Sequence, residues 1–331
     1  MGTRARRATR WLLVPALAVV LTLGWLMFWP MKSKPLETAV RPVSDFASAR
    51  DAILARIAGE PPEVRAEGRP VLLDHGHRTQ EVYVLLHGLT NCPAQYREFA
   101  RLLHARGSSV YIPRMPGHGY ADRLTTAQTL LTAESMAAAG TEAVNLAAGL
   151  GERVVVVGLS VNGVTAAWLG QEREDVALAV SIAPFFAPKG LPGWAIAPLT
   201  HTVLRLPNVF LWWDPRQKEA LAGSPYSYPR FATHTIGQAM LFGLDTFALA
   251  KAAPPAARKI LVVTSPDDEA VSLPRIEQLL ALWEPSGRAE TRSFPREWNV
   301  RHDCIDPDQP GAMVDKVYPQ LIAWMEEALG K

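Results

Sequence analysis

Cysteine is nearly absent from this sequence, which holds two cysteines in 331 residues. Two cysteines at their spacing match no zinc-binding pattern, and they cannot build the dense disulfide framework of a small secreted domain. The sequence also lacks an excess of charge of either sign, because 34 basic and 32 acidic residues leave a net charge of +2. The chain has no basic stripe and no basic run interleaved with aromatics, so we expect no nucleic-acid partner. It also contains no internal repeat and no low-complexity tract.

One long hydrophobic run stands at the N-terminus. Residues 11–29 are uncharged and almost wholly apolar. At a helical rise of 1.5 Å per residue, this run spans about 29 Å, close to the hydrocarbon thickness of a bilayer. Four arginines precede it, so the start of the chain is expected in the cytoplasm and the remainder outside. Because the bulky residues 28–31 offer no small-x-small cleavage site, an uncleaved signal anchor over residues 1–31 is favoured over a cleaved signal peptide.

The remaining sequence predicts a linking segment and one large domain. Residues 32–69 are expected to be a tether, with helical spacing at 44–57 that ends before Pro61 and Pro62. From residue 70 to residue 331, short apolar strands alternate with amphipathic helices. The expected strands are 71–73, 81–86, 109–113, 154–157, 176–183, 259–264 and 289–294, and the expected helices are 93–106, 132–150, 164–169, 273–283 and 313–329. This alternation is typical of a mostly parallel sheet with helices on both faces.

A serine lies at the sharpest turn of this pattern. Four consecutive valines, 154–157, predict a buried strand, and an apolar helix is expected soon after Ser160. A serine in a tight strand-to-helix turn has its hydroxyl exposed above the sheet, and the backbone N–H of Val161 would point at an oxygen on the attacked carbon. The usual pattern is G-x-S-x-G, whereas here Asn162 occupies the place of the second glycine. An ordinary strand-turn-helix with a surface serine is the alternative.

Four features in this order resemble those of the α/β-hydrolases, in the style of bacterial carboxylesterases and monoacylglycerol lipases. They are His87-Gly88 after a strand, the loop 116–119 (PGHG) after the next, the serine turn, and an aspartate followed by a histidine near the end. The resemblance covers residues 70–331 and implies an α/β-hydrolase fold with an inserted cap.

The resemblance also implies a catalytic triad in the chain order serine, acid, histidine. Family members place the acid at a strand end, commonly three residues before a valine. This spacing selects Asp268 over its neighbour Asp267, which is expected in a solvated turn. His302 is the one histidine after the last predicted strand, although Arg301 replaces the glycine that usually precedes it. Ser160, Asp268 and His302 are therefore the predicted catalytic residues.

Two further predictions concern the loops around this triad. By resemblance, the N–H groups of Leu89 and Val161 form the oxyanion hole. Cys92 and Cys304 flank the predicted oxyanion and histidine loops, which share one edge of the sheet in this fold. Because an exported domain meets an oxidising compartment, we predict a Cys92–Cys304 disulfide, with two buried free thiols as the alternative.

Residues 184–257 are too long for an ordinary connection between strands, and the family places its cap there. This segment is rich in aromatics, and Trp194, Trp212 and Trp213 are predicted to contact substrate, although a cap also needs aromatics for its own core.

Together these features predict a serine hydrolase that cleaves a lipophilic or acyl-glycerol-like carboxylic ester without cofactor or metal. Its expected location is the bacterial inner membrane, with a single pass and the catalytic domain on the periplasmic side. A peptidase or amidase on the same triad is the nearest alternative. An inactive hydrolase-fold binding protein of the cell envelope is the alternative from another class.

Overall fold

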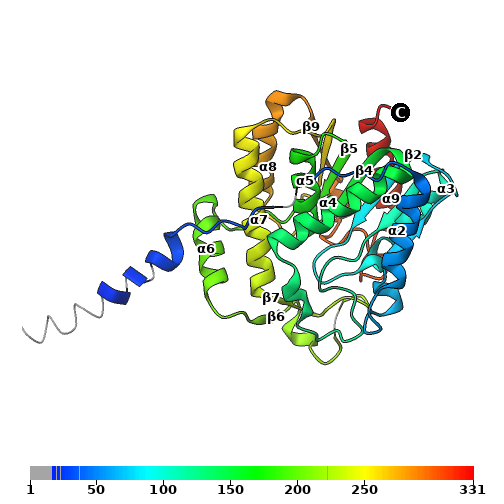
Figure 1. Ribbon diagram of the computed structural model, residues 1–331. Helices are drawn as coiled ribbons and strands as arrows, with labels where there is room; N and C mark the ends of the chain where they lie inside the picture. The colour runs from blue at the N-terminus through cyan, green and yellow to red at the C-terminus, as the bar shows by residue number, and fades with distance from the viewer. Residues whose placement is uncertain (1–16, 20, 23, 37, 222) are drawn as a thin grey trace, which may run out of the picture.

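The computed structural model describes residues 17–19, 21, 22, 24–36, 38–221 and 223–331. Its centre is a seven-stranded sheet in the order β1-β3-β2-β4-β5-β8-β9 (Figure 1). All neighbours pair in parallel except β1 and β3, which are antiparallel. The strands are β1 (Val71–Leu73), β2 (Thr79–Leu86), β3 (Ser109–Ile112), β4 (Gly151–Leu159), β5 (Val176–Ile182), β8 (Ile260–Thr264) and β9 (Ala289–Ser293).

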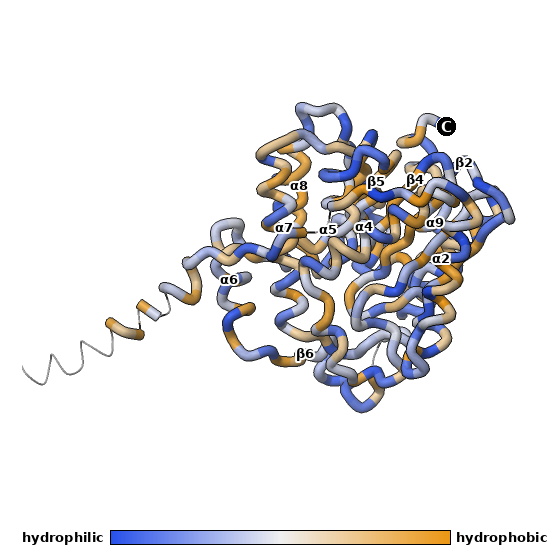
Figure 2. Tube along the Cα trace, in the orientation of Figure 1, coloured by the Kyte–Doolittle hydropathy of each residue, from blue (hydrophilic) through white to orange (hydrophobic). Residues whose placement is uncertain are grey.

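Helices cover both faces of this sheet, as the alternating pattern predicts. The main helices are α2 (Phe46–Ala58), α3 (Arg97–Ala105), α4 (Ala133–Leu150), α5 (Val161–Glu172), α6 (Gly193–Arg205), α7 (Thr233–Ala252), α8 (Leu273–Trp283) and α9 (Val314–Ala328). Residues of α2, α4, α5, α7 and α8 share one buried cluster with the sheet, whereas α3 and α9 contribute to a second. Hydropathy along the chain follows this arrangement, with hydrophobic residues gathered on the central strands and helices (Figure 2).

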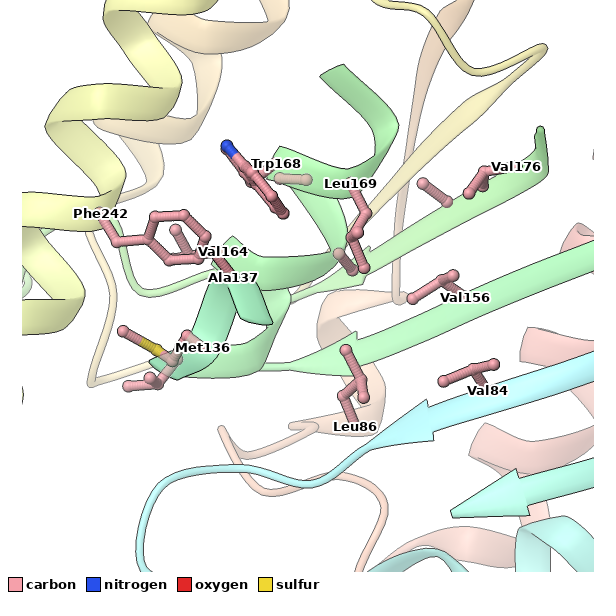
Figure 3. Packing of buried hydrophobic residues seen from close by; sticks show 14 of the residues in the cluster. Val84, Leu86, Met136, Ala137, Val156, Val164, Trp168, Leu169, Val176 and Phe242 are labelled. Atoms are coloured by element: carbon pink, nitrogen blue, oxygen red, sulfur yellow. The ribbon is translucent and has the colours of Figure 1, made fainter. Parts of the chain in front are cut away.

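The four valines of β4 show why this strand has no polar face. Val154 and Val156 belong to the cluster under α4 and α5, whereas Val155 and Val157 belong to the cluster under α3 and α9. Consecutive side chains of a strand point to opposite faces, so a sheet covered on both sides needs a continuous apolar run. Figure 3 shows the first cluster, in which Trp168 of α5 packs against Phe242 of α7.

The segment between β5 and β8 is more regular than its sequence suggests. It holds α6, the two-stranded sheet of β6 (Phe210–Trp212) and β7 (Arg230–Ala232), and then α7. The sequence pattern predicts no particular strand or helix between residues 184 and 258, so these elements were not anticipated. α7 packs on α5 and buries Met240, Phe242 and Phe247 in the main core, so the outer part of the insertion ends near residue 232.

The predicted tether contains a helix that packs on the domain. Ala49 and Ile53 of α2 are fully buried, and α2 lies against α4. The backbone N–H of Val43 donates to the carbonyl of Asn145 over 2.9 Å. Residues 43–58 therefore add to the core around α4.

The predicted membrane span at residues 11–29 lies largely outside the described residues. Its described residues 17–19, 21, 22 and 24–28 are helical and extend away from the body beside α6 (Figure 1). Among the residues that the structure describes, no helix has the length and apolar character needed to cross a membrane.

Candidate active site

Ser160 occupies a strained turn between β4 and α5. Its backbone has φ 59° and ψ −117°, a conformation that costs a non-glycine residue free energy and recurs at functional sites. The bend brings strand and helix so close that a Cβ on Gly158 would lie 2.0 Å from the carbonyl oxygen of Asn162. Only glycine fits there. The backbone N–H of Ser160 donates to the carbonyl of Ile182 over 2.9 Å, which ties the turn to β5.

The structure brings Ser160, His302 and Asp268 together from three distant parts of the sequence. His302 Nε2 lies 2.8 Å from Ser160 Oγ, and His302 Nδ1 lies 2.8 Å from Asp268 Oδ2. With Nδ1–H donating to the carboxylate, Nε2 carries the lone pair that can accept the serine proton. The chain of hydrogen bonds thus has the polarity required for general-base activation of a hydroxyl.

Asp268 is buried and accepts two backbone N–H groups besides the histidine ring. Its side chain is about 1% exposed, and Oδ1 accepts the N–H groups of Ala270 (2.8 Å) and Val271 (3.2 Å). Burial alone would raise the pKa of this carboxyl. The hydrogen bond and charge of His302, together with the two N–H groups, outweigh burial and leave the pKa below its usual value.

Asp267 has a different environment. Its carboxylate forms an ion pair with the exposed Arg296 over 3.2 Å.

The two predicted oxyanion donors lie in turns that follow the adjacent strands β2 and β4. Leu86 at the end of β2 pairs with Gly158 of β4, so the turns that carry Leu89 and Val161 leave the same edge of the sheet side by side. Val161 is the first residue of α5, where backbone N–H groups have no partner within the helix. Leu89 lies in the turn after β2 and is partly buried.

Asn162, which departs from the usual serine motif, connects the two turns. Its side chain is about 1% exposed, and its Nδ2 donates to the carbonyl of His87 over 2.5 Å. Its Oδ1 accepts the hydroxyl of Thr165 over 3.0 Å. A second glycine would supply neither bond. Sequence reasoning noted the departure but did not find its role, because the partner lies 75 residues away.

Two buried histidines support the loops behind the oxyanion turn. His87 Nε2 accepts the N–H of Met115 (3.1 Å), and His118 Nε2 accepts the N–H of Thr90 (3.4 Å). Each Nδ1 in turn faces a backbone carbonyl, which fixes one neutral tautomer. Burial lowers the pKa of both rings, to about 4 for His118. They therefore act as neutral structural groups.

One of the three predicted cap tryptophans hydrogen-bonds to the turn after β2. Trp213 Nε1 donates to the hydroxyl of Thr90 over 3.0 Å, and its ring packs against Phe231. Trp194 lies in the first turn of α6 and is 76% exposed. Trp212 of β6 lies near the ammonium group of Lys218. Of these three predicted substrate contacts, Trp213 is the one that hydrogen-bonds to the turn after β2.

The predicted Cys92–Cys304 disulfide is wrong, because both thiols are free and buried in this structure. They belong to separate apolar clusters: Cys92 packs with Ala94 and Tyr226, whereas Cys304 lies in the cluster under α3 and α9. Sharing one edge of the sheet does not bring two side chains together. Burial raises the pKa of Cys92 to about 12.

The model of the alpha/beta hydrolase family matches residues 83–316, well over half of the chain. No curated protein sequence gives a match.

Several solved structures are similar in fold. A structure from the work on LipS and LipT, two metagenome-derived lipolytic enzymes, has a TM-score of 0.60 at 19% identity and covers 80% of this chain and 99% of its own. The monoacylglycerol lipase of Paleococcus ferrophilus has a TM-score of 0.58 at 17% identity, covering 78% of this chain and 98% of its own. A soluble variant of the monoglyceride lipase of Saccharomyces cerevisiae has a TM-score of 0.57 at 13% identity. It covers 79% of this chain and 91% of its own. The chain belongs to the alpha/beta hydrolase family.

Proposed function

We propose that this alpha/beta hydrolase is a serine esterase that cleaves a lipophilic carboxylic ester. The observation that carries the proposal is the hydrogen-bonded chain from Ser160 through His302 to Asp268, with both links at 2.8 Å. Fold alone would not assign an activity, but a serine with an oriented base and a buried acid has a definite chemistry. The structural similarity to lipolytic enzymes and monoacylglycerol lipases favours an ester over other acyl substrates.

The proposed reaction has two balanced halves. Ser160 Oγ attacks the ester carbonyl while His302 Nε2 takes the hydroxyl proton, and the carbonyl oxygen becomes an oxyanion held by the N–H groups of Leu89 and Val161. The tetrahedral intermediate then expels the alcohol, which receives the proton from His302. Water, deprotonated by His302, then attacks the acyl-enzyme, and the second tetrahedral intermediate releases the acid while His302 returns the proton to Ser160 Oγ. Asp268 stays ionised throughout and stabilises the imidazolium form of His302.

A lipophilic substrate suits the exposed apolar side chains of the cap. The cap elements α6 and β6 and the loop after each expose large apolar side chains: Trp194, Leu199, Leu206, Val209, Leu211 and Trp213. Exposed large apolar side chains of this kind suit contact with apolar ligands or partners.

We also propose that residues 11–29 anchor the protein in the bacterial inner membrane with the hydrolase domain on the periplasmic side. This proposal rests on the apolar run and the arginines before it. The described part of the run contacts the cap, where Arg205 of α6 donates to the carbonyl of Leu26 over 2.8 Å and lies over the ring of Trp25. Fractionation of bacterial membranes, with protease accessibility of the domain, is the corresponding test.

The activity is tested with p-nitrophenyl acetate, butyrate, octanoate and laurate, and with p-nitrobutyranilide as the matched amide. We expect all measurable turnover on the esters, with kcat/KM rising from acetate to the longer chains, and its loss in His302→Ala. Faster cleavage of the anilide than of the butyrate ester would instead establish an amidase. No turnover of any substrate by the well-folded protein would contradict the proposal.

A further inference from the structure

One buried side chain lies between the histidine loop and the oxyanion turn. Gln95 belongs to the short helix η2 (Pro93–Tyr96) and is about 1% exposed. Its Oε1 accepts the backbone N–H of Gly88 over 2.8 Å, and its Nε2 donates to Asp303 Oδ1 over 2.9 Å. Gly88 immediately precedes Leu89, and Asp303 immediately follows His302.

We propose that Gln95 and Asp303 form a positioning pair that sets the spacing between the base His302 and the oxyanion donor of Leu89. Neither residue touches the reacting atoms in this proposal, which rests on the proposed esterase function. Gln95 acts on Leu89 through the Gly88 peptide, and Asp303 acts on His302 through the main chain. The geometry points to one rigid connection between two loops that come from opposite ends of the domain sequence.

The partners of Gln95 allow only one orientation of its side-chain amide. A backbone N–H must meet an acceptor, and a carboxylate must meet a donor, so the amide of Gln95 cannot turn over without losing both bonds. Glutamate at this position would keep the bond to Gly88 but would set one carboxylate against another. An apolar residue of the same length would keep the packing and lose both bonds.

Asp303 is held as a hydrogen-bond acceptor rather than as half of an ion pair. Its other partners are Asn91 Nδ2 (3.3 Å), Gln309 Nε2 (3.2 Å) and the N–H of Asp306 (3.3 Å), none of which carries a positive charge. Burial and the nearby Asp306 raise the pKa of Asp303. A carboxylate that is removed from water without a neighbouring cation costs folding free energy. The hydrogen-bond donors around Asp303 offset part of this cost and fix its position.

A neighbouring set of bonds attaches this network to the cap. Asp306 is fully buried and accepts the hydroxyls of Ser224 and Tyr226 as well as Asn91 Nδ2 over 3.0 Å. Asn91 thus donates to both carboxylates. Its two contacts hold the histidine loop at Asp303 and Asp306. Asn91 and Gln95 thus both donate to Asp303, and Gln95 also accepts the N–H of Gly88 next to Leu89.

A charge-swap experiment on the full chain separates positioning from simple packing. Gln95→Glu is expected to lower kcat on p-nitrophenyl butyrate by about tenfold to a hundredfold with KM nearly unchanged, because displaced catalytic groups affect the transition state most. Adding Asp303→Asn reverses the polarity of the contact, since an amide N–H can then donate to the new carboxylate. The same amide keeps an oxygen toward Asn91 and Gln309. The double variant should therefore be faster than Gln95→Glu alone.

Two controls make the outcome specific. Gln171→Glu alters another buried glutamine, which bonds Trp283 and the carbonyls of Ala253 and Pro254, and it should lower stability without changing kcat. Gln95→Met removes both bonds without adding charge, so it replaces Gln95→Glu if the latter does not fold, and it should also lower kcat. All rates are referred to the concentration of sites that a fluorophosphonate can label.

The results distinguish this inference from the proposed function. A wild-type protein that neither labels nor cleaves the ester would refute the esterase itself. If the wild type is active, unchanged kcat in Gln95→Glu and Gln95→Met would refute the positioning pair. So would a double variant no faster than Gln95→Glu, because the contact between residues 95 and 303 would then carry no coupling.

Discussion

Acid should destabilise this fold through its buried histidines, and His118 allows the effect to be calculated. The ring is fully buried, its Nδ1 faces the carbonyl of Pro116 at 2.9 Å, and its Nε2 accepts the N–H of Thr90. A second proton would place an N–H against another N–H inside the protein. Burial, reinforced by the charge of Arg114, lowers the pKa of His118 from 6.5 to about 4.

The sign and size follow from linkage between proton binding and folding. Because the pKa is lower in the folded state, the unfolded chain binds more protons between about pH 6.5 and pH 4. Stability is therefore complete above about pH 6.5 and is lost as the pH falls toward 4. Each tenfold difference in proton affinity is worth about 1.4 kcal/mol, so His118 alone accounts for about 3 kcal/mol. This is a large part of the 5–15 kcal/mol that is typical of a domain.

The assay is urea unfolding, followed by tryptophan fluorescence, at several pH values from 7.5 to 5. His118→Asn is expected to be less stable than the wild type at pH 7.5, because packing against Tyr228 is lost. Its free energy of unfolding should fall less steeply with acid, by about 1 kcal/mol per pH unit near pH 5. The exposed His77→Asn is the control and should keep the wild-type slope. Equal slopes in His118→Asn and the wild type would refute the neutral buried ring.

Three other predictions test the site and its surroundings. Asp268→Asn should lower kcat by about a thousandfold or more because the histidine loses its orienting acceptor, whereas Asp267→Asn should change it little; ester hydrolysis by the two variants compares them directly. Asn162→Ala leaves a buried carbonyl at the end of β2 without its donor, so it should cost about 1–3 kcal/mol in urea unfolding, and equal stability would show that this bond is unimportant. Cys92 and Cys304 should both resist alkylation in the native protein and both react after denaturation without reductant; reaction only after reduction would restore the disulfide.

Much of the fold could be predicted because its strands are buried on both faces. Short β-branched runs such as 154–157 have few other stable conformations, and strands 71–73, 109–112 and 289–293 lie within one residue of their expected ends. α7 was not predicted, because its sequence lacks a one-sided apolar pattern. It is apolar on several sides and contains Gly237 and Gly243, each packed closely against a neighbouring side chain, so its sequence shows no clear helical stripe.

The site shows a similar division between local and distant information. Ser160 is marked by its own turn, and the order of residues in a known fold leads to His302 and Asp268. The bonds of Asn162 and Gln95 depend on where a partner many residues away is placed, and no local pattern carries that information. The disulfide prediction failed for the same reason, because it inferred side-chain contact from loop position alone.

The most direct test of the central claim is to react the protein with a fluorophosphonate probe and locate the adduct by mass spectrometry, with Ser160→Ala and His302→Ala alongside. An activated serine requires the base within hydrogen-bond reach, as His302 is here. We expect a single adduct on Ser160, strongly slowed labelling in His302→Ala and none in Ser160→Ala. A folded wild-type protein that stays unlabelled, or an adduct on a different residue, would contradict it.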